Sequence, residues 1–161
     1  MRFALLSLLV LSTPLLAADE IKLSQISLEQ IQKAIAAHKG KVVLVDIWAT
    51  FCAPCKEKFP SVVKMHKEYA KDGLVVISLT IDELDDEKHA LEFLKKHEAT
   101  FANYILKDTD ANKDAWEKRW ANIAPPIVHL YDREGKKVKT LEGKTEVSGT
   151  EAIVKELLKA K

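Results

Sequence analysis

Two cysteines separated by two residues are the side chains in this sequence best suited to chemistry. They are Cys52 and Cys55, the only cysteines among 161 residues, and they come shortly after the apolar run Val42–Ile47. A pair at this spacing can cycle between a dithiol and a disulfide. If a helix begins at the cysteines, the first sulfur lies where unsatisfied N–H groups and the helix macrodipole favour a thiolate. Because the thiolate attacks other disulfides, the segment predicts a redox site.

Two other uses of the cysteines are less favoured. A structural disulfide that closes so short a loop stabilises the fold by only about 2 kcal/mol, against about 3 kcal/mol for a 15-residue loop. Structural zinc needs two further close ligands, and the five histidines are scattered without a paired spacing. We therefore expect redox chemistry, no metal site and no cofactor.

The first residues resemble a secretory signal peptide. A positive start at Met1-Arg2 precedes an apolar run over 3–11, and the small residues Ala17 and Ala18 offer a cleavage site after either one. The run is shorter than the roughly 20 residues that span a bilayer. We predict a leader over 1–18 and one domain over 19–161, located in the periplasm or another oxidising extracytoplasmic space.

Charge gives little further information about function. Lysine and arginine number 25 and aspartate and glutamate 24, and loss of Arg2 with the leader leaves formal neutrality. No basic stripe with interleaved aromatic residues is present, so we expect no nucleic-acid partner. Too few mature residues precede Ser27 to form a dimerisation region, which predicts a monomer.

Hydrophobic periodicity predicts alternating strands and helices. Ser27 and Gln30 form a capping-box pattern before the first helix, and Pro60 should kink the helix that starts at the cysteines. Residues 82–87 are expected to form a solvated acidic loop. The other expected elements are strands over 42–48, 74–81, 101–106, 127–131 and 136–141, a polar turn at 108–112, and helices after 86, at 115–120 and from about 149 to 160. This order predicts an α/β sandwich around one mixed sheet.

The segment Val45–Lys56 resembles the active site of the thioredoxin superfamily. Trp48-Ala49-Thr50, Phe59-Pro60, the insert after Asp82 and the segments 125–126 and 130–135 are similar to its exported TlpA/ResA/CcmG-type branch. The resemblance implies a thioredoxin-like sandwich. Its mixed central sheet would be flanked by helices, with a helical insert after the second core strand.

The resemblance also implies roles for individual residues. Cys52 would be the exposed nucleophile and Cys55 the resolving thiol, while Ala53 and Pro54 would tune the redox potential. Asp46 matches the family's buried acid, which exchanges a proton with the resolving cysteine; a buried carboxyl can do so near neutral pH. The alternative for Asp46 is a polar strand residue that faces a cavity.

Three further positions are implied to shape substrate binding. Pro126 matches the family's cis-proline, which presents backbone to an extended substrate strand. Pro125 before it lacks an N–H that such a strand would otherwise bond. Trp48 would shape the docking surface, or is simply a core tryptophan.

Some residues depart from the family pattern. Lys58 stands where the ResA-type branch usually has an acid, and Glu57 is one position earlier, turned by about 100° on a helix. Whether Glu57 or Lys58 tunes the cysteines stays open from the sequence, and the alternative to an acid here is that Lys56 and Lys58 favour the Cys52 thiolate. His129 replaces a core phenylalanine, either as an internal histidine or as a proton shuttle.

The sequence thus predicts an exported thiol–disulfide oxidoreductase acting on protein cysteines. The resemblance favours a reductant, recharged by a membrane electron-transfer protein, with clients such as apocytochrome c. The same chemistry run in reverse would make it an oxidant. A copper carrier using both thiolates is a second alternative, although Met65 stands alone once the leader is removed.

Overall fold

The computed structural model describes residues 20–107 and 124–160. The predicted leader, the polar turn at 108–112 and the short helix at 115–120 lie outside these ranges. No helix within them combines the length and apolar character needed to cross a bilayer.

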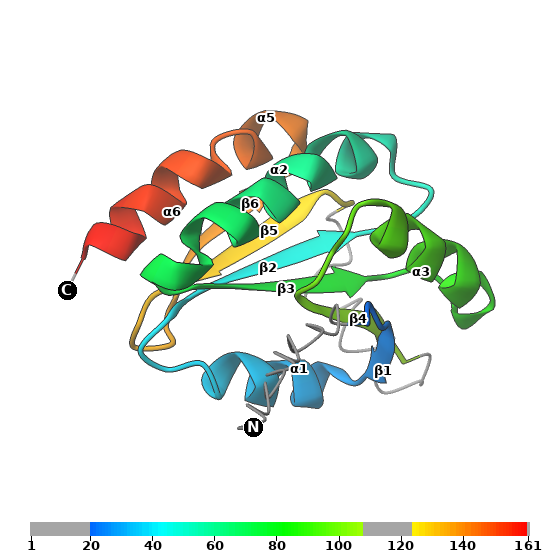
Figure 1. The fold of residues 1–161 in the computed structure, drawn as a ribbon, viewed down its shortest axis with the longest axis horizontal. Helices are drawn as coiled ribbons and strands as arrows, with labels where there is room; N and C mark the ends of the chain where they lie inside the picture. Colours follow the sequence, from blue (N-terminus) through cyan, green and yellow to red (C-terminus); the bar gives the residue numbers. More distant parts are fainter. Residues whose placement is uncertain (1–19, 108–123, 161) are drawn as a thin grey trace, which may run out of the picture.

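The described residues form one mixed sheet, as the sequence predicts, and it has six strands (Figure 1). Its strands are β1 (Ser24–Ile26), β2 (Val42–Trp48), β3 (Leu74–Thr80), β4 (Ala102–Leu106), β5 (Ile127–Tyr131) and β6 (Lys137–Glu142). They lie in the order β1-β4-β3-β2-β5-β6. Strands β1, β4, β3 and β2 run parallel to one another, β5 pairs antiparallel with β2, and β6 pairs antiparallel with β5.

Helices cover both faces of the sheet (Figure 1). They are α1 (Leu28–Ala36), α2 (Ala53–Tyr69), α3 (Glu87–Lys96), α5 (Gly143–Val147) and α6 (Thr150–Lys159), with short 3-10 turns η1 (Ala70–Asp72) and η2 (Leu84–Asp86). Helix α1 covers one face, while α2, α5 and α6 cover the other. The helix predicted after residue 86 is α3, which is the expected insert after the second core strand. Helix α2 continues through Pro60, whose predicted kink stays a prediction.

Strand β2 is buried along its whole length, which confirms the interpretation of its continuous apolar run. Alternate side chains pack in two separate cores. The core under α2 contains Val42, Leu44 and Trp48, and the core under α1 contains Val43, Val45 and Ile47. By this alternation, Asp46 points to the α2 side, the side on which the cysteines lie.

The capping box at the start of α1 is confirmed. The Ser27 hydroxyl accepts a hydrogen bond from the backbone N–H of Gln30 at 3.2 Å, and the Gln30 side chain accepts from the Ser27 N–H at 2.9 Å. Two orphan donors of the first turn are thereby satisfied.

The end of the sheet remote from the cysteines is held by Arg133. Its guanidinium donates to the backbone carbonyls of Gly40 at 3.0 Å and Leu158 at 3.1 Å. It also donates to those of Ala160 at 3.3 Å and Asp72 at 3.5 Å. One side chain therefore joins the turn before β2, the turn before β3 and the last turn of α6.

Aromatic rings join α3 to α2 and to the end of β2. The centroid of Phe93 lies 4.9 Å from that of Trp48 and 5.0 Å from that of Phe59. Two histidines border this group: His97 lies 4.5 Å from Phe93, and the ring of His66 meets Phe101 edge-on at 5.2 Å.

This cluster predicts a loss of stability in acid. Burial lowers the pKa of His66 and of His97, and a neighbouring lysine adds to each shift. The unfolded chain, with a histidine pKa of about 6.5, then binds more protons than the folded one. The free energy of unfolding should be fully retained above about pH 6.5 and fall as the pH drops through the lower folded values.

Urea denaturation at several pH values checks this, with H66Q/H97Q expected to flatten the profile. H38Q, in the turn after α1, serves as the control. An equal acid dependence in H66Q/H97Q and the wild-type protein would contradict the assignment.

Candidate redox site

Cys52 and Cys55 form a disulfide at the start of α2. The S–S distance is 2.02 Å and the Cα atoms lie 5.3 Å apart. Cys52 is the N-cap residue of the helix, and its Sγ accepts a hydrogen bond from the backbone N–H of Cys55 at 3.2 Å. The predicted position of the first sulfur at the helix N-terminus is confirmed. This position favours a thiolate when the disulfide is reduced.

The expectation that Cys52 is exposed is wrong for the disulfide form. Its side chain keeps 6% of its accessible surface, and that of Cys55 keeps 0%. Cys52 is still the more accessible of the two, so an attacking sulfur reaches it first. Neighbouring residues cover the remainder of both side chains.

The two residues between the cysteines form the first turn of α2. Ala53 is exposed and Pro54 is half-buried. A proline is tolerated here because the first N–H groups of a helix have no partner within the helix. The turn that the sequence predicts to tune the cysteines is thus open to solvent at Ala53.

The peptide bond between Pro125 and Pro126 is cis, as the resemblance implies for Pro126. Ile127, the next residue, pairs with Ile47 in the antiparallel register of β5 on β2. The two prolines therefore lie near the end of β2, where the chain turns to the cysteines. Pro125 is half-buried and Pro126 is buried.

Phe51 is a surface residue that the sequence analysis did not single out. Its side chain is 72% exposed, directly before Cys52. In the described part of the chain, the other large exposed hydrophobic residue is Val138, at 40%. The sequence feature that could have identified it is an aromatic residue placed after the buried strand ends, in the turn before the cysteines. An exposed aromatic ring beside a reactive sulfur is suited to contact a partner protein.

Trp48 belongs to the core. It is fully buried, and its indole N–H donates to the Ser78 hydroxyl at 2.7 Å. A side chain with no exposed surface does not contact a docked protein, so its assignment as a substrate contact is corrected. Its ring packs on Phe59 and thereby supports α2 from below.

Asp46 and Lys58 form an ion pair beneath the first turns of α2. The carboxylate is fully buried and the Lys58 side chain keeps only 10% of its surface. Neither group has another hydrogen-bond partner among the described residues. Lys58 follows Cys55 by three residues, so both lie on the inner side of the helix. Of the partners that the sequence left open for Lys58, the structure shows the Asp46 carboxylate.

The surroundings of Lys58 act on its charge in two directions. Burial lowers the pKa of Lys58 to about 7. The Asp46 carboxylate opposes this, because an adjacent opposite charge favours the ammonium form. Glu57, by contrast, pairs with Lys144 of α5 at 2.6 Å on the surface, and Lys56 is exposed.

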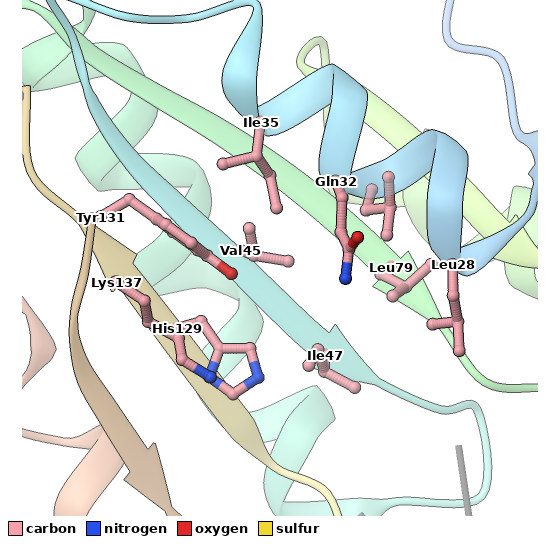
Figure 2. Close-up of a pocket in the computed structure, with 10 residues that line it drawn as sticks. Leu28, Gln32, Ile35, Val45, Ile47, Leu79, His129, Tyr131 and Lys137 are labelled. Carbon is pink, nitrogen blue, oxygen red and sulfur yellow. The ribbon is translucent and has the colours of Figure 1, made fainter. Parts of the chain in front are cut away.

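His129 lies on the other face of the sheet. It is buried, its Nδ1 lies 3.0 Å from the Thr140 hydroxyl, and it borders a cavity of about 50 Å³ under α1 (Figure 2). The sheet separates this cavity from the cysteines, so His129 is an internal histidine and not their proton shuttle. In residues 20–107 and 124–160, no three His, Cys, Asp or Glu side chains are grouped to hold a metal ion.

Solved structures with the same architecture define the class of fold. The thioredoxin domain of a thiol-disulfide oxidoreductase from Bacteroides vulgatus superposes with a TM-score of 0.56 at 27% identity, covering 74% of this chain and 83% of that domain. A thiol-disulfide isomerase from Corynebacterium glutamicum gives a TM-score of 0.66 at 19% identity, covering 78% and 86%, which supports the fold alone. The protein has a thioredoxin-like fold with a Cys-x-x-Cys disulfide.

The sequence itself places the chain more narrowly. The model of the Redoxin family matches residues 16–158, nearly the whole length, so the chain belongs to this family. It is 31% identical over 107 residues to the thiol-disulfide oxidoreductase ResA of Bacillus subtilis, covering 65% of this chain and 55% of ResA. It is 34% identical over 98 residues to the thioredoxin-like protein YneN of the same organism, covering 60% and 54%. The chain thus spans less than two thirds of the length of these relatives.

The buried pair predicts a strong coupling between Asp46 and Lys58. K58M leaves a lone buried carboxylate and should lower the free energy of unfolding by about 3–5 kcal/mol. D46L/K58M removes both charges and should regain most of that loss. Urea denaturation of D46L, K58M and D46L/K58M measures the coupling free energy between the two side chains.

K56M changes an exposed lysine two residues away and should stay within about 0.5 kcal/mol of the wild-type protein. If the effects of D46L and K58M on the free energy of unfolding simply added in the double variant, the charges of Asp46 and Lys58 would not interact.

Proposed function

We propose that this protein is a thiol–disulfide oxidoreductase that exchanges disulfides with other proteins through Cys52 and Cys55. The observation that carries the proposal is the disulfide at the N-terminus of α2, with Cys52 as the more accessible sulfur. Relatives named thiol-disulfide oxidoreductases support it.

The exchange proceeds in two balanced steps. In the reducing direction, the Cys52 thiolate attacks a substrate disulfide, forms a mixed disulfide and releases one substrate sulfur as a thiolate, which takes up a proton. Cys55 then loses its proton and attacks Cys52. The Cys52–Cys55 bond forms, the mixed disulfide breaks, and the second substrate sulfur leaves. Two electrons pass to the substrate, and the protein ends in its disulfide form.

Asp46 is the proposed acceptor of the Cys55 proton. It is buried on the α2 side of β2, and Lys58 accompanies it from the inner side of the helix that carries Cys55. The ammonium favours the carboxylate form of Asp46, which is the form that can accept a proton. Lys58 therefore supports the base, in a position where the ResA-type branch usually has an acid.

Substrate docking is proposed for the surface around Cys52. Phe51 and Ala53 are its exposed members, and Pro125 and Pro126 border it at the start of β5. Because Pro125 has no N–H, an extended substrate strand bonds to backbone carbonyls here and gains its remaining affinity from apolar contact with Phe51.

The proposed direction in the cell is reduction, in a periplasmic or other extracytoplasmic space. The resemblance to the ResA type and the expected leader over 1–18 support this, with a membrane electron-transfer protein as the donor and apocytochrome c cysteines among the clients. Equilibration with glutathione tests the direction. A potential well below that of the glutathione couple supports a reductant, and one well above it indicates an oxidant.

C55S should trap substrates. Without the resolving thiol, the mixed disulfide on Cys52 cannot be displaced from within, so it accumulates. Non-reducing electrophoresis and mass spectrometry of extracytoplasmic proteins would detect adducts that a reductant releases.

C52S is the matched control and should form far fewer adducts, because the remaining sulfur is fully buried. Equal trapping by both variants would overturn the assignment of the nucleophile. Absence of adducts together with tight, stoichiometric Cu(I) binding by the wild-type protein would favour the copper carrier.

F51A should weaken docking. The loss of an exposed ring beside the nucleophile is expected to lower kcat/KM for a protein disulfide about tenfold, corresponding to about 1.4 kcal/mol. Turnover of insulin disulfides measures this effect.

V138A removes the other exposed hydrophobic side chain, which lies on β6, and should leave insulin turnover unchanged. Equal effects of F51A and V138A would remove Phe51 from the docking surface.

A further inference from the structure

Asp82 lies just after β3 and is buried, with 4% of its surface exposed. The sequence predicts a solvated acidic loop here, and that expectation is wrong for this residue. Both carboxylate oxygens accept the backbone N–H of Thr50, at 2.9 and 3.0 Å, and one also accepts the Thr50 hydroxyl at 2.7 Å. The Thr80 hydroxyl donates to the other oxygen.

These bonds attach one segment of the active site to the end of a neighbouring strand. Thr50 lies in the turn between β2 and α2, two residues before Cys52. In the same turn, the Cys52 N–H donates to the Ala49 carbonyl at 3.1 Å, and the Ile81 N–H donates to the Trp48 carbonyl at 3.0 Å. The backbone from Trp48 to Cys52 is therefore bonded at successive points, and Asp82 supplies the one at Thr50, the residue before Phe51.

The burial of Asp82 is offset by its hydrogen bonds and not by apolar contact. A buried carboxylate is expensive to desolvate, and the partners recorded for Asp82 are hydroxyl and amide donors. A neutral, apolar residue would fill this place more cheaply, but it would not hold Thr50. The segment held in this way carries both the nucleophile and the exposed ring of Phe51.

We propose that Asp82 is a positioning residue for disulfide exchange: by holding Thr50, it fixes the turn that presents Phe51 and Cys52 together to a protein substrate. This inference rests on the proposed function. A small disulfide needs only the sulfur, whereas a protein disulfide needs the sulfur and the ring at a fixed separation. Loss of Asp82 should therefore harm the reaction with proteins more than the reaction with small molecules.

The test compares D82N with E83Q. In D82N, an NH₂ group replaces one acceptor oxygen, so one of the donors from Thr50 or Thr80 loses its partner. E83Q also removes one negative charge, but Glu83 is exposed. The fully reduced proteins are mixed with insulin and, separately, with glutathione disulfide, and both second-order rate constants are measured.

We expect D82N to slow the reaction with insulin about tenfold and to slow the reaction with glutathione disulfide clearly less. E83Q should match the wild-type protein with both. In an F51A background, D82N should slow the reaction with insulin by a smaller factor, because the ring that Asp82 positions is gone. T50V, which retains the backbone N–H, should give a smaller effect of the same kind and serves if D82N does not fold.

Equal slowing with both disulfides, or lower stability with unchanged rate constants, would overturn the proposal and leave Asp82 a structural residue. An undiminished effect of D82N in the F51A background would also overturn it. A wild-type protein that reacts with neither disulfide would instead refute the proposed function, so the two failures are distinguishable.

Discussion

Strand β2 is the element on which the site depends, because its pairing brings three separate segments together at its carboxyl end. Its parallel partner β3 ends beside it, and its antiparallel partner β5 begins there. The exit of β2 leads to the cysteines, the exit of β3 to Asp82 and the entry of β5 follows the cis-proline. The complete burial of β2 fixes the register of these pairings, since a one-residue shift would exchange its two packed faces.

The α2 side of β2 combines apolar packing with one buried ion pair. Trp48 and Leu44 lie against the helix, while Asp46 between them meets Lys58. Such a pair contributes little net stability, since desolvation offsets the attraction. Under the proposed function, its value in this position is chemical, because the Lys58 ammonium favours the carboxylate form of the proposed proton acceptor. A surface pair such as Glu57 with Lys144 would not serve this purpose, because water already stabilises both charges.

Much of the fold could be predicted because its signals are local. The apolar run of β2, the capping box at Ser27 and the cysteines before α2 each depend on neighbouring residues only. Strand β1 was not predicted, because its three residues of mixed polarity become a strand only by pairing with β4. The short helix α5 has too few residues to show a helical period.

The site was predicted less completely, for a related reason. The spacing identified Cys52 and Cys55, and the resemblance pointed to Asp46 and Pro126. The partner of Lys58 could not be deduced, because a long side chain can reach either the sulfurs or the strand below. Asp82 looked solvated because acidic residues surround it in sequence, and only the tertiary fold places Thr50 beside it.

Arg133 joins three segments at the end of the sheet opposite the disulfide. Its four carbonyl partners tie the turns before β2 and β3 to the end of α6, at the end of the sheet away from the disulfide. Fusion partners, labels or surface linkers attached at the end of α6 would lie away from the disulfide, so they should leave the proposed docking surface unobstructed.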